Sequence, residues 1–311
     1  MRKILFFLLM LFASHAYTQI VNIPDANFKN YLVNYSPRID VNFDNQIQVS
    51  EAAAVTGNFA IYASGFSNIT GIESFTGITG LYCDGSSITT FNPSSGLNSL
   101  QAINIYGSSL TSLNLSAIST LQQVYMTNNS QIASLNVSGL TNLISLDIED
   151  NPLMTSLTIS GTTNLQSITC TGNGVTSLDF TNLHNLNTIS CSENKIGSLT
   201  ITGMPNLTLL SCADNNLASL SISNCPLLNT LFCDNTGIIP PYYNHFTSLD
   251  LSGFSNLNTL YCNNVGLTSL AEGNGRRRIS SHGRSALHDQ SIKCTIQLRN
   301  HGATGKAVAS A

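Results

Sequence analysis

A spacing of 21 or 22 residues recurs through most of this chain and limits the folds open to it. Nine positions follow the spacing, with a final step of 29 residues: Cys83, Ile105, Met126, Ile148, Cys170, Cys191, Cys212, Cys233 and Cys262. Around each position, L-x-C and L-x-I segments alternate with the period of two that is typical of short strands. One such unit cannot bury its apolar row alone, so the units are expected to stack around a continuous core.

The full unit reads L-x-x-L-x-(C/I/M)-x-x-N-x-(L/I/V)-x-x-L-x-(L/I/V/F), which is the leucine-rich repeat pattern, and the resemblance covers residues 78–270. An asparagine follows the strand in the central units, where its amide can bond the backbone of neighbouring turns: Asn129, Asn151, Asn173, Asn194 and Asn215. Other residues replace it near the ends: Ser86, Ser108, Thr236 and Val265. We expect an α/β repeat fold, a solenoid of about nine coils of 21–22 residues over residues 61–270, with a parallel sheet and an N-terminal helical cap.

The form C-x-x-N-x-L-x-S-L-x-(L/I), with cysteine in the strand, resembles the secreted, internalin-like leucine-rich-repeat proteins of Bacteroidetes bacteria. Residues 23–32 and 46–52 also resemble the segment that precedes the array in such proteins. The resemblance implies a secreted or cell-surface binding protein with no enzymatic activity, and it implies no particular ligand. The C-terminal residues do not resemble the sorting domain that many such proteins carry, which leaves anchoring and the export route open.

The first residues are typical of an export signal. Met1-Arg2-Lys3, an apolar run over residues 4–12 and small residues up to Ala16 predict a secretory signal peptide at residues 1–16. The apolar run is about half of the ~20 residues that span a bilayer, so an uncleaved anchor is the weaker alternative. No later segment is apolar enough to span a membrane.

Charge is divided unevenly along the chain. Residues 17–270 contain three basic residues against fourteen acidic ones. This balance disfavours nucleic acid as a partner and favours a basic partner or a cation. Residues 271–311 contain seven basic residues and two acidic ones, without a repeat. We interpret this tail either as a disordered basic arm that touches the acidic body or an anionic surface, or as truncated or out-of-frame sequence.

Residues 17–60 are expected to form a helical cap with a calcium-binding loop. One helix should span about 25–34, and Ser50 should cap a second helix. The segment between them places oxygen-bearing residues at the spacing of an EF-hand loop: Asp40, Asn42, Asp44, Gln46, Gln48 and Glu51. Asn45 takes the place of the usual glycine and tolerates a left-handed backbone. Calcium would be structural and weakly bound; the alternative is a polar connector in which Glu51 only favours the helix dipole.

The side chains that flank the central strand position should point away from the core and line a concave face. We predict that a ligand binds there through Tyr82, Asp84, Tyr106, Tyr125, Asp147, Glu149, Ser190, Glu193, Phe232 and Tyr261. Aromatic residues anchor interfaces and the acids would favour a basic partner. The alternative is that a solenoid simply keeps its outer faces polar. The insertion at residues 238–246 is either a tolerated surface insertion or a second contact loop.

The repeated cysteines take a position that Ile or Met fills in other coils, so we interpret them as reduced thiols in the core. A linear row spaced ~4.8 Å apart lacks the tetrahedral cage of a zinc site. Disulfides are the rival interpretation because the protein is expected to be exported. Cβ atoms on adjacent parallel strands, however, lie farther apart than the ~3.8 Å that a disulfide prefers.

The sequence contains no Gly-rich phosphate loop, His-Glu-x-x-His helix or nucleophile elbow. We therefore predict that the chain is not an enzyme and uses no organic cofactor. The favoured function is an extracellular or cell-surface binding or adhesion module for a protein, peptide or glycan, without nucleic acid and without a transmembrane segment. The alternative is a structural surface or matrix repeat protein that has no specific ligand.

Overall fold

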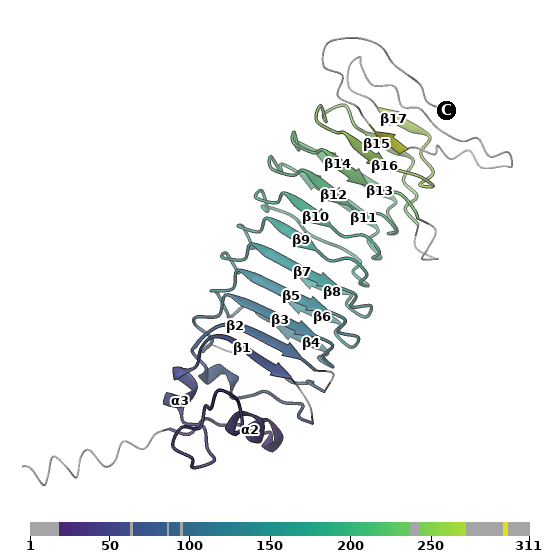
Figure 1. Ribbon diagram of the computed structural model, residues 1–311. Coiled ribbons are helices and arrows are strands. Elements are labelled where there is room, and N and C mark those ends of the chain that lie inside the picture. Colours follow the sequence, from purple (N-terminus) through teal and green to yellow (C-terminus); the bar gives the residue numbers. More distant parts are fainter. Residues whose placement is uncertain are drawn as a thin grey trace, which may run out of the picture.

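The computed structural model describes residues 19–62, 65–85, 87–93, 96–236, 243–271 and 295–297. It is a solenoid whose coils stack along one axis, with a small helical cap at the N-terminal end (Figure 1). The cap contains helices α2, Ala26–Val33, and α3, Val49–Ala54, and the short 3-10 helix η1, Ile72–Ser74, follows in the first coil. The expected signal peptide at residues 1–16 lies outside the described residues. No helix in the described part of the chain has the length and apolar character needed to cross a bilayer.

One face of the solenoid is an eleven-stranded sheet in which ten strands run parallel. In spatial order its strands are β1 Thr56–Tyr62, β2 Gly77–Asp84, β3 Ala102–Tyr106, β5 Gln123–Thr127, β7 Ser145–Glu149, β9 Ser167–Thr169, β10 Thr188–Ser190, β12 Leu209–Ser211, β14 Thr230–Phe232, β16 Thr259–Tyr261 and β18 Thr295–Gln297. The expected leucine-rich-repeat solenoid with its parallel sheet is thus confirmed.

The L-x-(L/I/V/F) segments of the repeat form short strands on a second face of the coils (Figure 1). These belong to three small sheets: β4 Ser112–Asn114, β6 Ser134–Asn136 and β8 Ser156–Thr158; β11 Ser198–Thr202 and β13 Ser219–Ser223; β15 Ser248–Asp250 and β17 Ser269–Ala271. The leucine of each Ser-Leu pair points inward, as Leu113, Leu135 and Leu157 show. The two sets of strands therefore enclose a single apolar core that runs from Val21 to Leu267.

Strand β1 extends the array at its N-terminal end by one coil beyond the nine repeats. Phe59 and Ile61 are buried and pair in register with Leu81 and Cys83 of β2. The boundary expected between residues 60 and 61 falls inside this strand. The segment lacks leucine, which hid it from a pattern built on leucine spacing.

The cap closes the open end of the core with aromatic side chains. Tyr35 packs on Phe59 at a ring-centroid distance of 4.6 Å, and Phe28 packs on Phe66 at 5.2 Å. The carboxylate of Asp25 caps α2 by accepting hydrogen bonds from the N–H groups of Asn27 and Phe28. The expectation that Ser50 caps the second helix is wrong, because α3 begins one residue earlier and its N-cap is Gln48.

Buried asparagines join neighbouring coils, as expected. The Asn173 Nδ2 group donates to the carbonyl oxygens of Ile148, at 2.8 Å, and Cys170, at 2.7 Å, while its Oδ1 accepts from Asn151 N–H at 3.0 Å. The other members of this asparagine ladder repeat the arrangement. Ser108 replaces asparagine at one end and bonds the Oδ1 of Asn129 through both its N–H and its hydroxyl.

In the eighth coil, an asparagine that follows the insertion takes the ladder position. Asn244 is buried, and its Nδ2 donates to the carbonyl oxygens of Cys212, at 2.9 Å, and Cys233, at 3.1 Å. Phe246 is buried two residues later. Residues 244–246 thus belong to the regular coil, and the insertion expected at 238–246 ends before them; residues 237–242 lie outside the described residues. The signal missed in the sequence was the N-x-F spacing, which matches the N-x-(L/I/V) of other units.

The far edge of the long sheet carries an antiparallel strand. Residues Thr295–Gln297 form β18 and pair with β16. The sequence predicted no strand in residues 271–311, because three residues are too few to show alternation. A sheet edge offers unpaired N–H and C=O groups, which explains why even a short β-branched segment pairs there. The remaining interpretations of the tail concern residues outside the described part.

Replacing a ladder asparagine should destabilise the solenoid strongly. Asn173→Ala leaves several buried backbone groups without a partner, and each unsatisfied group costs about 1–3 kcal/mol. We expect a loss of at least about 2 kcal/mol in urea unfolding followed by circular dichroism. Asn164→Ala is the matched control, because exposed Asn164 makes one hydrogen bond to the preceding coil, and it should change stability by less than about 1 kcal/mol. Equal losses in the two variants would contradict the ladder's role.

Candidate functional site

The outward side of the long sheet carries two rows of side chains in register. The first row runs Tyr82, Asn104, Tyr125, Asp147, Thr169, Ser190, Ser211, Phe232 and Tyr261. The second runs Tyr62, Asp84, Tyr106, Thr127 and Glu149. We call these two rows the sheet face. Nine of the ten predicted ligand-binding residues belong to these rows, and eight of the nine are aromatic or acidic. Glu193 lies outside the rows. Neighbouring members of a row stand about 4.8 Å apart at their Cα atoms.

Exposed tyrosines surround a carboxylate at the N-terminal end of the sheet face. Asp84 pairs in register with Tyr62 on one side and Tyr106 on the other. Tyr62, Tyr82 and Tyr106 are 66%, 40% and 47% exposed, which is high for aromatic side chains. Tyr62 was missed by the sequence analysis because β1 precedes the nine-repeat alignment. The alternation F-A-I-Y, parallel to L-Y-C-D in the next coil, was the signal that could have found it.

Two half-buried acids follow in the centre. Asp147 of β7 lies beside Tyr125 in the first row, and Glu149 lies two residues further along the same strand. Burial raises the pKa of Asp147, and its Oδ1 atom has no hydrogen-bond partner among the described residues. Burial, and then the charges of Asp147 and Asp150, raise the pKa of Glu149. These carboxylates therefore hold negative charge in a place where it is poorly solvated.

In the C-terminal part of the sheet face, the side chains interact mainly with one another. The Ser190 hydroxyl shares a hydrogen bond of 3.1 Å with Thr171, so its group is engaged within the face. Phe232 and Tyr261 are half-buried and pack against each other with ring centroids 5.1 Å apart. Nearby Asp234 has a raised pKa, first because of burial and then because of the charge of Asp214.

Glu193, one of the predicted ligand-binding acids, and two similarly placed acids have a conformational role. Asp150, Glu193 and Asp214 precede ladder asparagines and have left-handed backbones, with φ values of 55°, 58° and 49°. Short polar residues tolerate this conformation best, which accounts for Asp at the position. Glu193 is exposed on this turn and lies outside the two rows, whereas Asp214 is buried and accepts hydrogen bonds from Thr236.

Five of the six residues of the predicted calcium loop lie between α2 and α3, and the sixth, Glu51, lies in the first turn of α3. Asp40, Gln48 and Glu51 are buried, Gln46 is half-buried, and Asn42 and Asp44 are exposed. Backbone N–H groups of the loop bond the carboxylates. Three or more His, Cys, Asp or Glu side chains do not converge as a metal cluster anywhere in the described residues.

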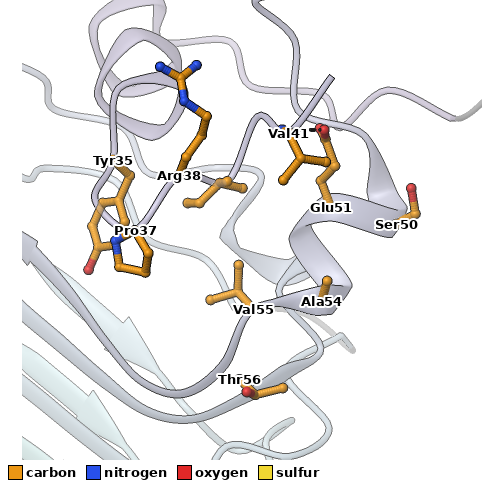
Figure 2. Close-up of a pocket in the computed structure, with 10 residues that line it drawn as sticks. Tyr35, Pro37, Arg38, Val41, Ser50, Glu51, Ala54, Val55 and Thr56 are labelled. Atoms are coloured by element: carbon orange, nitrogen blue, oxygen red, sulfur yellow. Dashed lines mark hydrogen bonds between the residues drawn. The ribbon is translucent and has the colours of Figure 1, made fainter. Parts of the chain in front are cut away.

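A pocket of about 440 Å³ lies on the other side of this loop (Figure 2). Its walls are mainly apolar, and Glu51 turns its carboxylate toward Val41, whose N–H it accepts at 2.8 Å. Arg38 lies with its guanidinium 4.5 Å from the ring centre of Phe43. The two charged groups of the pocket, Glu51 and Arg38, are thus already engaged, and we assign no second candidate site to it. Its lining residues are Tyr35, Pro37, Arg38, Ile39, Val41, Ser50, Glu51, Ala54, Val55 and Thr56.

The cysteine row proves to be part of the core. All seven described cysteines are free and buried; six of them are the repeated cysteines interpreted as reduced thiols, and the seventh, Cys225, lies outside that row. Burial raises the pKa of Cys83 and of Cys191 to about 12. These sulfurs are therefore protonated, apolar packing groups at neutral pH rather than metal ligands or nucleophiles.

The seven buried thiols should resist modification in the folded protein. Thiolate is the reactive form, and at pH 8 a thiol with a pKa of about 12 is only ~0.01% ionised. Titration with a chromogenic disulfide reagent should count at least seven more thiols in denaturant than under native conditions, without prior reduction. An equal count in both states, or a deficit in denaturant that reductant restores, would contradict buried, reduced cysteines.

The raised pKa of Asp147 predicts a pH-dependent stability difference. A carboxyl whose pKa is higher in the folded state destabilises the fold above that pKa, and the penalty disappears once the pH falls below its unfolded value. Asp147→Asn should therefore raise the urea midpoint at pH 7 and give no gain at pH 3. Asp179→Asn is the control of opposite sign, because hydrogen bonds from Thr181 lower the pKa of Asp179. A gain for Asp147→Asn that is the same at both pH values would contradict an electrostatic origin.

Comparison with known proteins supports the fold. Neither a family model nor a curated protein matches this sequence. Solved structures do match, among them the functional domain of InlJ from Listeria monocytogenes, described as including a cysteine ladder: 24% identity, TM-score 0.50, covering 82% of this chain and 61% of that one. Internalin C2 of Listeria monocytogenes matches at 23% identity and TM-score 0.50, covering 70% of this chain and 99% of that one. The chain thus shares its solenoid fold with internalins and spans under two thirds of the InlJ chain.

Proposed function

We propose that this chain is a binding module whose sheet face takes a basic segment of a protein or peptide, anchored by Asp84 and the tyrosines around it. The observation that carries the proposal is the alternation of exposed tyrosines and carboxylates along a face whose eleven strands contain no Lys, Arg or His. A face kept polar only for solubility would have no need of three exposed tyrosines in adjacent coils.

The spacing at the N-terminal end suits one cationic side chain. Tyr62 and Tyr106 stand two strand spacings apart, or ~10 Å, with Asp84 between them. A Lys or Arg side chain that lies over Asp84 would contact both rings. Each exposed cation–π contact contributes about 0.5–1 kcal/mol, and an exposed ion pair at most about 1 kcal/mol. One such anchor gives weak binding.

Further groups of aromatic and acidic side chains along the sheet face would add to the affinity. Tyr125 with Asp147 and Glu149 offers a second group of aromatic and acidic side chains, and Tyr261 with Phe232 and Asp234 offers a third. A basic segment that runs across the coils could engage these groups together, so that the second and third contacts become intramolecular. Lysine or arginine near Asp147 and Glu149 would also relieve the buried negative charge that raises their pKa values.

Other features of the chain fit this role. The expected signal peptide at residues 1–16 supports a secreted or cell-surface location, and the resemblance to internalin-like proteins of Bacteroidetes supports adhesion as its context. A polyanion such as nucleic acid is disfavoured by the acids of the face. We assign no catalytic role: the rings of His184 and His245 lie 2.7 and 3.1 Å from the backbone oxygens of Gly203 and Tyr243.

Binding of model peptides tests the proposal. Fluorescein-labelled octa-arginine should bind the full chain, more weakly as salt is added, whereas octaglutamate should not bind. Removing the anchor with Tyr62→Ser, Asp84→Asn and Tyr106→Ser together should weaken octa-arginine binding about tenfold, because the three contacts sum to about 1–3 kcal/mol and ~1.4 kcal/mol corresponds to that factor. Fluorescence anisotropy measures both affinities.

The matched control changes the same residue types away from the sheet face. Tyr243 is 41% exposed beside the insertion and Asp250 lies on β15, so Tyr243→Ser with Asp250→Asn should leave the affinity unchanged. A greater loss in this control would move the site to the insertion. Equal affinity of the parent and the triple variant would contradict the proposal. Self-association in light scattering, with no peptide binding, would favour the structural matrix protein instead.

A further inference from the structure

In the loop over residues 40–51, side-chain oxygen atoms accept hydrogen bonds from the loop's own backbone N–H groups. Asp40 accepts hydrogen bonds from the N–H groups of Phe43, at 2.9 Å, and Asn45, at 3.2 Å. The side chains of Asn42 and Asp44 each accept from the N–H two residues further along the chain. Asn45 has the left-handed backbone expected of it, with φ 61°. Such folding would also suit a polar connector, so it does not by itself indicate a ligand.

A separate observation does point to one. Gln48 is 2% exposed and its Oε1 atom has no hydrogen-bond partner among the described residues. The amide faces the Glu51 N–H without bonding it, while its Nε2 donates to Asp44 Oδ2 at 2.8 Å. The Gln48 amide therefore lies between the Asp44 carboxylate, which its Nε2 bonds, and the first turn of α3, which its oxygen faces. A buried oxygen without a donor is unfavourable, and a cation or a cation-bound water beside Asp44 would satisfy it.

The charges of the loop also lack a full counterion. Asp40 and Glu51 are buried, and neither forms an ion pair with a described Lys or Arg; their partners are backbone N–H groups. Lys29 comes closest, but its Nζ bonds the side-chain oxygen of Gln46 at 2.6 Å. Hard oxygen ligands with three carboxylates suit Ca²⁺ rather than Zn²⁺, which prefers nitrogen and sulfur.

We propose that this loop binds one Ca²⁺ ion and thereby fixes the cap. Side-chain oxygens of Asp40, Asn42, Asp44 and Glu51 and the main-chain carbonyl of Gln46 would be ligands, and Gln48 would bind directly or through a water, as position 9 of such loops often does. The carboxylates do not converge in this structure, so binding requires Asp44 and Glu51 to turn inward and the Gln48 amide to rotate. A single loop without a paired partner is expected to bind in the range ~10⁻⁴–10⁻³ M.

The position of the loop explains what calcium would do. Val21 N–H bonds the carbonyl of Ile47 at 2.8 Å, and Val49 N–H bonds that of Gln19 at 2.7 Å, so residues 19–21 are held against the loop's exit. Helix α3 starts there and leads directly into β1. Calcium would thus hold together the N-terminal segment, the loop and the first strand, at the end where the solenoid core would otherwise be open.

Thermal unfolding of the full chain in CaCl₂ tests the proposal. At 10 mM calcium, Tm should rise by about 3–10 °C over a calcium-free sample, and by less in MgCl₂. Terbium luminescence excited through the tyrosines should report the same site, because the chain has ten Tyr and no Trp. Asp44→Asn removes one charged ligand and should weaken terbium binding at least about tenfold and reduce the rise in Tm. Asp84→Asn, an exposed acid on the sheet face, should leave them unchanged.

The calcium response of Gln48→Glu distinguishes the two interpretations. With a calcium site, the new carboxylate lowers Tm without calcium, because it stands beside Asp44 and Glu51, but it increases the rise in Tm on adding calcium and tightens binding several-fold. In a polar connector, it lowers Tm equally at every calcium concentration. Equal calcium responses of the parent, Asp44→Asn and Gln48→Glu proteins, or no terbium binding by the folded parent, would overturn the proposal.

Discussion

The amide of each ladder asparagine bonds backbone groups in its own coil and in the one before it. Asn173 reaches Ile148, one coil earlier, and Cys170, in its own coil, and its Oδ1 accepts from Asn151. A shift of one coil by a single residue would break this set and would also turn every inward side chain outward. The ladder therefore fixes the register of the long sheet, and the apolar rows, the cysteine row and the sheet face all depend on that register.

A fixed register leaves the outward positions free from packing. Tyr62, Tyr82 and Tyr106 contribute little to the core, yet they occur in consecutive coils beside Asp84. Asp147 even opposes stability, since its buried Oδ1 has no hydrogen-bond partner in the part of the chain that the structure describes and burial raises its pKa. A repeat protein tolerates such a local cost because neighbouring coils support each unit. Residues that break the local rules of folding are expected to concentrate at functional sites.

The periodic part of the fold was predictable because one short pattern sets strand, turn and core in every coil. The features that the pattern did not predict are in segments whose sequence departs from the repeat. Strand β1 uses Phe59 and Ile61 in place of leucine, so its coil and Tyr62 went unseen. Asn244 keeps the ladder after an insertion that shifts it eight residues from its expected place at Thr236. The N-cap of α3 is Gln48 rather than Ser50, and it depends on the Glu51 carboxylate, which accepts the Gln48 N–H, a contact that spacing alone does not reveal.

The cap and the sheet face meet at one strand. The hydroxyl of Tyr31, on α2, accepts the N–H of Tyr62 at 3.2 Å and donates to the carbonyl of Ala60 at the same distance, so the cap bonds the outer edge of β1 directly. That edge would otherwise carry unpaired backbone groups open to another chain. Tyr62 is also the first aromatic residue of the sheet face. The hydrogen bonds of Tyr31 thus join the cap directly to the residue with which the proposed anchor begins, so the proposed calcium loop and the proposed binding face belong to one N-terminal unit.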